Sequence, residues 1–427
     1  MVVRASELGD LIRQDRVAGR IYTDPEIFDV EMEKIFNRSW VFVCHETQVS
    51  EPGDYFSTFI GLNPVIVARG ADDGEVRVFL NRCRHRGNIV CQYESGNANY
   101  FRCAYHGWTF NNQGRLIGVP FRDAYADFFQ GEDMDLVQVS RVGVYKGFVF
   151  ACVAGDPPSL EEWIGPAHRY LDEFAAQGPE GIIVNAGCQK AMYRGNWKFQ
   201  NENDADNYHT DFTHAVGAVI RSKRAQSRGE RIARSGQPPG SIVRALGHGH
   251  SANSRLQSVG LGVSYEGATS SGLTRPYVEA LEARLGVEKT KELLTTAGNP
   301  PHTFRMFPNL VLIGTQIRVT RPVSVGVAEN YYWPVNLKGV PDEVNAIRLR
   351  QHEQGFGPAG FTSPDDVEVF ARNQIGLRAR QNDWQIMARG LHREQRDEQG
   401  VPFGEVKDET GMRSIYQEWK RLMTAVT

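Results

Sequence analysis

The sequence lacks a long apolar run, since nowhere do about 18 consecutive apolar residues occur, the length that a transmembrane helix needs. It also lacks an excess of charge of one sign: 48 Lys and Arg stand against 51 Asp and Glu. Binding to DNA or RNA through counter-ion release would require a strongly basic balance. The N-terminal residues mix acids with bases and contain no apolar stretch of the secretory type. We therefore expect a cytoplasmic protein that binds neither nucleic acid nor a membrane.

Cysteine is scarce, with six residues in a chain of 427. In a chain without an export signal thiols stay reduced, so these residues are expected to fill the core or bind metal rather than form disulfides. No Gly-rich phosphate loop of the P-loop or Rossmann kind is present, and no plant-type C-x4-C-x2-C run. The chain is longer than one hydrophobic core supports, about 250–300 residues, so two domains are expected.

Short alternating runs of apolar and polar residues, separated by Gly and Asp clusters, extend from about residue 53 to residue 153. This pattern is typical of a small all-β module. It changes after Pro157-Pro158, where Ser159 and Glu162 form a capping box ahead of apolar residues at helical spacing. A second domain is expected to begin there.

The second part mixes helix-like and β-like runs. Residues 276–297 and 413–425 have helical periodicity, and 303–335 reads as strands. These patterns predict an α+β domain in which helices pack on an antiparallel sheet. Residues 220–258, rich in Arg, Ser and Gly, are interpreted as a mobile surface segment.

A first metal-binding pattern lies inside the β module. Cys83 and His85 form C-x-H, and after seventeen residues Cys103 and His106 form C-x2-H. Two thiolates and two imidazoles suit either a closed structural zinc site or a Rieske [2Fe-2S] cluster, in which two His replace two Cys on one iron. Zinc modules usually open with a pair of Cys, whereas here each loop supplies one Cys and one His. The spacing therefore favours the [2Fe-2S] cluster.

A second pattern surrounds His209 and His214. Two His five residues apart on a helix point about 140° away from each other, so they can share an ion only if the helix is distorted or ends nearby. Asp206, three residues before His209, is suited to hold that His by a hydrogen bond. A 2-His-1-carboxylate iron site needs a third ligand from elsewhere. Asp366 is the best candidate and Asp365 the alternative.

These two patterns together resemble a known family. The first, with Arg86-Gly87 and Gly107-Trp108, resembles the Rieske domain of the ring-hydroxylating oxygenases. The second, N-x-x-D-x-Y-H-x4-H, is preceded by G-N-W-K and followed near the end of the chain by G-P-A-G-F-x-x-x-D-D. It is similar to the large (alpha) subunit of Rieske non-haem iron dioxygenases, most of all to the benzoate, toluate, cumate and anthranilate group.

The resemblance implies an all-β Rieske domain at 40–156, inserted in or preceding a catalytic domain made of 1–39 and 157–427. It implies one [2Fe-2S] cluster on the Cys and His residues of the first pattern. It also implies one mononuclear Fe(II) bound by His209, His214 and Asp366. Asp206 would act in catalysis, because in the family this residue bridges the ligand His to the second Rieske His of a neighbouring subunit.

The activity that the resemblance implies is cis-dihydroxylation of an aromatic ring by O2, with a single-ring carboxylate such as a benzoate derivative as the expected substrate. Electrons would come from NADH through a separate ferredoxin or flavin reductase. The expected assembly is a homotrimer of alpha subunits joined by small beta subunits, α3β3. A Rieske monooxygenase or O-demethylase is the nearer alternative, and a non-catalytic Rieske or zinc protein the more distant one.

Residues that contact the substrate are predicted only from their proximity in the sequence to the metal-ligand motifs. Asn203, Phe356 and Thr362 stand close to the ligand motifs and are the candidates for the pocket. A carboxylate substrate requires a cationic or amide partner. Arg318 and the bases of 221–244 are candidates for that role, with an exposed position on a strand as the alternative for Arg318.

Overall fold

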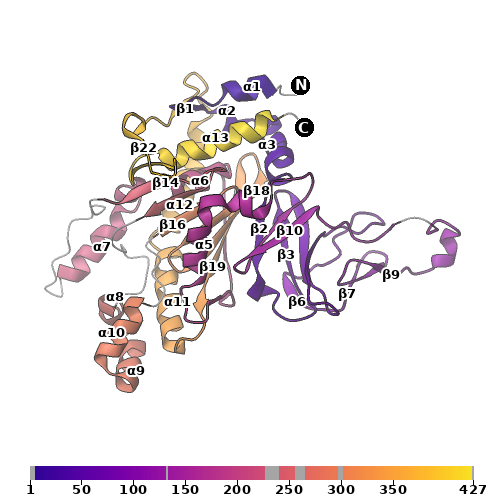
Figure 1. Cartoon of the computed structure of the whole chain (residues 1–427), viewed down its shortest axis with the longest axis horizontal. Helices are drawn as coiled ribbons and strands as arrows, with labels where there is room; N and C mark the ends of the chain where they lie inside the picture. The colour runs from indigo at the N-terminus through magenta and orange to yellow at the C-terminus, as the bar shows by residue number, and fades with distance from the viewer. Residues whose placement is uncertain (1–4, 131–132, 227–239, 255–264, 297–301, 426–427) are drawn as a thin grey trace. The chain divides into compact units, whose positions relative to one another are not determined.

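The computed structural model describes residues 5–130, 133–226, 240–254, 265–296 and 302–425 (Figure 1). The chain forms two compact units, one made of Met32–Leu160 and the other of Met1–Glu31 with Glu161–Thr427. The first unit is therefore inserted into the second along the sequence. The division at residues 40 and 156 that the sequence suggests stays a prediction. None of the described helices combines the length and apolar character that a bilayer span requires.

The inserted unit is built from antiparallel strands in three small sheets, with strand orders β10-β11-β2, β5-β4-β3-β6 and β7-β8-β9. Its strands are β2 (Val41–His45), β3 (Asp54–Ile60), β4 (Asn63–Arg69), β5 (Val76–Leu80), β6 (Ser95–Asn97), β7 (Tyr100–Arg102), β8 (Thr109–Asn111), β9 (Leu116–Gly118), β10 (Arg141–Tyr145) and β11 (Phe148–Cys152). A π-helical turn, Met32–Phe36, precedes them, and 3-10 turns follow β2 (Glu46–Gln48) and β9 (Arg122–Tyr125). Strands β3 and β4 combine buried with partly buried residues and do not alternate strictly, so their short length and the turn residues between them are the clearer sequence signal of this unit.

The other unit is organised around a nine-stranded antiparallel sheet of order β13-β19-β18-β17-β16-β15-β14-β23-β22. Its strands are β13 (Gln189–Tyr193), β14 (Ile242–Ala245), β15 (Ser251–Ser254), β16 (His302–Met306), β17 (Leu310–Ile313), β18 (Gln316–Ser324), β19 (Val327–Pro334), β22 (Gln395–Arg396) and β23 (Pro402–Glu405). Two short pairs, β1 (Arg16–Ala18) with β21 (Trp384–Ile386) and β12 (Ile182–Ile183) with β20 (Asn336–Leu337), complete its strands among the described residues.

Helices pack on this sheet, so the predicted fold class, an all-β domain with a catalytic domain of antiparallel sheet and helices, is confirmed. The described α-helices are α1 (Ala5–Asp10), α2 (Arg20–Thr23), α3 (Pro25–Glu31), α4 (Leu160–Ile164), α5 (His168–Ala175), α6 (Lys198–Ala205), α7 (Ala215–Gln226), α8 (Tyr265–Ser270), α9 (Arg275–Leu285), α10 (Val287–Thr296), α11 (Asp342–Phe356), α12 (Ser363–Gly376) and α13 (Thr410–Thr424). Short 3-10 turns lie at Gly165–Ala167, His209–Asp211 and Leu391–Arg393. Helix α13 crosses the sheet beside α6 and β14 (Figure 1).

Two expectations are wrong in this unit. The helix expected at 276–297 is divided into α9 and α10 by Gly286, whose φ of 81° leaves the helical region. The segment 220–258 is not wholly a surface segment, because β14 and β15 lie inside the nine-stranded sheet with Val243 and Ala252 fully buried. Residues 227–239 and 255–258 of that segment lie outside the described residues.

A buried ion pair fixes the start of helix α6. Lys198 Nζ lies 2.6 Å from Glu31 Oε1, and both side chains are fully buried. The indole N–H groups of Trp197 and Trp419 donate to the same carboxylate, at 2.9 Å and 2.7 Å. Glu31 therefore ties together α3, α6 and α13, with each of its oxygens satisfied by a donor.

Replacing Lys198 by Met should destabilise this unit by about 3–5 kcal/mol, because it leaves the Glu31 carboxylate buried without a counter-charge. The double variant Lys198→Met/Glu31→Gln removes both charges and keeps an acceptor for one of the two indole groups, so it should recover part of the loss. Thermal unfolding followed by circular dichroism measures both. A double variant no more stable than Lys198→Met alone would contradict this account.

Candidate metal centres

Helix α6 ends where the first candidate metal centre begins. Asp206 leaves the helical region with φ −101° and ψ 131°, and its Oδ1 accepts from the backbone N–H of Tyr208 at 2.6 Å and of His209 at 3.2 Å. These bonds satisfy donors of the next turn, which continues as the 3-10 turn at His209. His209 and His214 therefore do not share one regular helix. The distortion that a common ion would require is present.

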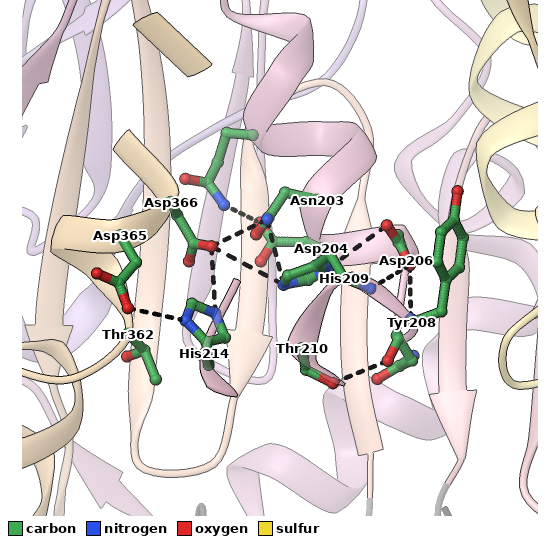
Figure 2. A network of polar contacts seen from close by, with 12 residues as sticks. Asn203, Asp204, Asp206, Tyr208, His209, Thr210, His214, Thr362, Asp365 and Asp366 are labelled. Atoms are coloured by element: carbon green, nitrogen blue, oxygen red, sulfur yellow. Dashed lines mark hydrogen bonds and ion pairs between the residues drawn. The ribbon is translucent and has the colours of Figure 1, made fainter. Parts of the chain in front are cut away.

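The three predicted iron ligands lie together. The ligand atoms of His209, His214 and Asp366 are all within 4.8 Å of one another. Asp366 Oδ1 lies 3.2 Å from Nε2 of His214 and 3.8 Å from Nε2 of His209 (Figure 2). His214 and Asp366 are buried, so the group faces the protein interior.

A tight reversal of the chain brings Asp366 to this position. The backbone N–H groups of Asp365 and Asp366 donate to the carbonyl of Thr362, which starts helix α12. In the loop between α11 and α12, a Cβ on Gly360 would lie 2.5 Å from the carbonyl oxygen of Gly355. Only glycine permits this approach, so the glycine-rich sequence ahead of the two aspartates has a steric cause.

Each imidazole also faces a carboxylate on its outer side. His209 Nδ1 lies 3.5 Å from Asp206 Oδ2, and His214 Nδ1 lies 3.5 Å from Asp365 Oδ2 (Figure 2). Such contacts leave Nε2 of each ring for a metal and orient the ring. Burial alone would lower the pKa of His209, but Asp206 and, more weakly, Asp366 outweigh it and raise that pKa.

This donor set suits Fe(II). In non-haem iron oxygenases, two imidazoles and one carboxylate bind the iron on one face and leave its other coordination positions for other ligands. The side-chain nitrogen of Asn203 lies 3.2 Å from both His209 Nε2 and Asp366 Oδ1. Asn203 therefore borders the space that a metal ion would share with these groups.

The second candidate centre is in the inserted unit, on two loops of matching geometry. In each loop the N–H of a glycine donates to the carbonyl of the cysteine four residues earlier: Gly87 to Cys83 at 2.9 Å and Gly107 to Cys103 at 3.0 Å. The two glycines have φ of 73° and 72°. His85, on the first of the two loops, stacks on Trp108 with ring centroids 5.0 Å apart.

These loops fit a [2Fe-2S] cluster. The Cys83 and Cys103 thiols are buried, while the rings of His85 and His106, 4.6 Å apart, lie further out, with His106 exposed. Burial raises the pKa of the Cys103 thiol, but backbone amides and the Asn88 side chain outweigh it and lower that pKa. Donors directed at sulfur stabilise the thiolate form that binds iron.

The predicted substrate residues lie in different surroundings. Asn203 borders the iron ligands, and Phe356 is buried against Val311 and Ile313. The hydroxyl of Thr362 donates to the carbonyl of Gly355, so its polar group is used within the loop. Their roles toward substrate stay predictions.

Arg318 is not exposed on a strand. It is buried, and its Nη1 donates to Asp204 Oδ1 at 2.7 Å. The pairing of Asp204 with Arg318 and the contact of Asp365 with His214 were not predicted. Arg318 is 114 residues after Asp204, and Asp365 is 151 residues after His214, so no local pattern relates the partners. A carboxylate beside each ligand motif was the only signal in the sequence.

Comparison with known proteins identifies the family. Residues 39–137 match the Rieske [2Fe-2S] domain and residues 161–425 match the catalytic domain of the ring-hydroxylating alpha subunit. The chain thus belongs to the Rieske non-haem iron oxygenases, as a ring-hydroxylating alpha subunit. The predicted family, enzyme class and pair of iron cofactors are confirmed.

Within this family, curated relatives cover most of the chain. It is 33% identical to the alpha subunit of toluate 1,2-dioxygenase from Pseudomonas putida, over 87% of this chain and 82% of that one. It is 33% identical to the large subunit of 2-halobenzoate 1,2-dioxygenase from Burkholderia cepacia, over 90% and 83%. It is also 32% identical to the alpha subunit of N,N-dimethyl phenylurea N-demethylase from a Sphingobium strain, over 84% and 79%.

Solved structures agree on the fold. Naphthalene 1,2-dioxygenase from a Rhodococcus species, bound to indole, superposes with a TM-score of 0.78 at 28% identity, over 96% of this chain and 95% of that one. A mutant naphthalene 1,2-dioxygenase bound to phenanthrene has a TM-score of 0.81 at 24% identity, over 99% and 96%.

We expect His214→Ala to lower iron from about three atoms to about two per chain and to leave acid-labile sulfide near two, because only the mononuclear site loses a ligand. Anaerobic metal and sulfide analysis measures this. Asp211→Asn, in the same turn but with its carboxylate paired to Lys407, is the matched control and should keep all the iron. Unchanged iron in His214→Ala would show that the ion binds elsewhere.

Proposed function

We propose that this alpha subunit is the terminal oxygenase that cis-dihydroxylates a single-ring aromatic carboxylate such as a benzoate derivative. The observation that carries the proposal is the convergence of His209, His214 and Asp366, from two distant segments, on one buried site. The toluate and halobenzoate dioxygenases among the relatives favour an aromatic acid as substrate.

The chain's own residues have distinct tasks in this proposal. His209, His214 and Asp366 would hold the mononuclear iron, and Cys83, Cys103, His85 and His106 would hold the cluster. When bound, the cluster supplies electrons one at a time and the Fe(II) offers positions for O2. Asp206 and Asp365, each 3.5 Å from an outer nitrogen, would orient the two imidazoles so that both Nε2 atoms face the same point.

Electrons would come from NADH through a separate reductase, with or without a ferredoxin, because the sequence carries no dinucleotide or flavin motif. We further propose a homotrimer, α3β3 where a small beta subunit is present, in the cytoplasm. Asp206 would link His209 to His106 of the partner subunit and so complete the electron path between the two kinds of iron.

The surface around His106, the exposed imidazole of the cluster loops, supports such an assembly. Three aromatic side chains of the inserted unit are exposed: Tyr105, which lies against His106, at 62%, Phe121 at 85% and Phe128 at 50%. Exposed aromatic groups gathered in one region commonly mark a surface that another protein covers. We call these three residues the aromatic rim.

A demethylase is the competing function, and the similarity to N,N-dimethyl phenylurea N-demethylase favours it specifically. Both activities would use the same two centres, so the ligands do not separate them. The products do: dihydroxylation retains the substrate's carbon skeleton, whereas demethylation releases formaldehyde.

The reconstituted enzyme, supplied with an NADH-dependent reductase, should convert benzoate or a toluate to a cis-diol that contains both atoms of one O2 molecule. Mass spectrometry of the product formed under ¹⁸O2 measures this. N,N-dimethylphenylurea and a methoxybenzoate complete the panel. Formaldehyde from these two, with no diol from any benzoate, would assign the demethylase function instead.

Asp206→Asn should keep both iron centres but slow electron transfer to the mononuclear site by about 10- to 100-fold or more. The Asn side-chain oxygen still accepts from Tyr208 and His209, so the turn is retained, while the negative charge beside Nδ1 of His209 is lost. Stopped-flow absorbance of the reduced cluster, mixed with O2 and benzoate, measures its re-oxidation. Asp211→Asn serves again as the control, and wild-type re-oxidation in Asp206→Asn would exclude the proposed path.

A further inference from the structure

Three buried polar side chains meet where strand β18 passes under the end of helix α11. Gln316 and Arg318 stand two residues apart on β18 and so point to the same face of the sheet. His352, on α11, has its Nε2 2.9 Å from Gln316 Oε1. Their exposed fractions are 0% for Gln316, 3% for Arg318 and 1% for His352. We call these three residues the polar corner.

The polar corner has hydrogen-bonding capacity that the described residues do not use. Gln316 Nε2, Arg318 Nε and His352 Nδ1 are buried and have no hydrogen-bond partner among the described residues. Because the Gln316 side-chain carbonyl can only accept, His352 Nε2 carries the proton and donates to it. The Gln316 amide is thereby oriented with its NH2 group free. Gln316 Nε2 and Arg318 Nε are therefore the unpaired donors, whereas Nδ1 of the neutral His352 ring is an acceptor. Leaving the two donors buried and unpaired costs about 1–3 kcal/mol each, so a group that accepts from them is expected.

An apolar surface adjoins these donors. Val311 is the register partner of Arg318, and Ile313 is that of Gln316, so both point to the same face. Phe356, one turn after His352, packs with Val311 and Ile313, and the Arg318 guanidinium carbon lies 5.5 Å from its ring centroid. An aromatic ring with one polar substituent matches this pairing of apolar surface and donors.

The polar corner also adjoins the candidate mononuclear centre. Arg318 pairs with Asp204, the residue after Asn203, which contacts both His209 and Asp366. Burial would lower the pKa of Arg318, but Asp204 first, then Tyr332 and Asp366, outweigh it and raise that pKa. Two neighbouring residues of α6, Asn203 and Asp204, connect the Asp366 carboxylate to the guanidinium through hydrogen bonds. A ring lying between Asp366 and Phe356 would extend its substituent toward β18.

We propose that the Gln316 side-chain amide and the free Nε–H of Arg318 bind the carboxylate of the aromatic substrate and so determine the preference for an acid over a neutral ring. The inference rests on the proposed function and adds to it the residues that read the substituent. Asp204 occupies Nη1 of Arg318, so the guanidinium is held in place while Nε remains to donate. A charged acceptor makes stronger hydrogen bonds with these donors than a neutral one does.

The test is binding of benzoate and of toluene to the oxidised holoenzyme, measured by isothermal titration calorimetry without turnover. Gln316→Leu removes the amide donor at similar volume, so benzoate should bind at least about tenfold more weakly, while toluene affinity should stay within about twofold. Gln316→Glu places a second carboxyl group at the same position and should weaken benzoate binding further.

Thr320→Val is the matched control, because Thr320 points to the same face of β18 but bonds to Asn330, away from the polar corner. It should leave both affinities unchanged. Iron and sulfide content confirm that each variant folds. Equal losses for benzoate and toluene in Gln316→Leu, or no loss, would overturn the inference, as would a wild type that binds toluene but not benzoate.

The two proposals fail in different ways. If the wild type forms a cis-diol from benzoate while Gln316→Leu and Gln316→Glu bind benzoate normally, the oxygenase function stands and the polar corner is only structural. If the wild type forms no diol from any aromatic acid, the proposed function fails. A selective loss of benzoate binding in the variants would still support the polar corner, because calorimetry requires no turnover.

Discussion

The mononuclear centre depends on one carboxylate that ends a helix. If α6 continued past Ala205, His209 and His214 would point about 140° apart and could not approach a common ion. Oδ1 of Asp206 binds two backbone N–H groups of the next turn, and Oδ2 faces Nδ1 of His209. The same side chain therefore changes the path of the chain and orients the first ligand. Backbone geometry and ligand geometry cannot vary independently at this position.

Helix α6 can serve as the reference for the site because buried charges hold both of its ends. Lys198 pairs with Glu31 at the start, and Asp204 pairs with Arg318 at the end. Between them burial raises the pKa of Glu202 to about 7, although hydrogen bonds from Tyr22 and Tyr416 and the charge of Lys198 oppose this. Burying an ion pair costs desolvation free energy, so these two pairs need not stabilise the fold overall. What they contribute is that the helix is held in one position. Asn203 and Asp206 lie on or directly after this helix and take their places from it.

Local patterns in the sequence predicted the ligand residues of both centres, because each ligand pair lies within one short segment. Cys83 and His85 are close enough in the sequence for their spacing alone to indicate a metal site. The spacing of His209 and His214 likewise shows, without any distant residue, that a regular helix could not hold both on one ion. The third ligand, Asp366, was chosen from two adjacent carboxylates that follow a Gly-rich turn, with Asp365 as the alternative, and the family resemblance then supported it, since no local rule selects one carboxylate 152 residues after His214. Likewise, strands β14 and β15 are short and lie among Arg, Ser and Gly, so only their neighbours in the sheet reveal them.

The two centres differ in how they face their surroundings. His214 and Asp366 are buried, as oxygen chemistry requires, because water must be kept from a reactive site. The cluster loops reverse this order, with thiols inside and the His106 ring exposed. An electron carrier must have one side that another redox centre can approach. In this unit that side is formed by the imidazoles of His85 and His106. Tyr105 of the aromatic rim lies against His106 and is itself exposed, so a single chain leaves apolar surface uncovered beside this ring. A protein that covered this surface would therefore also reach the exposed edge of the cluster loops.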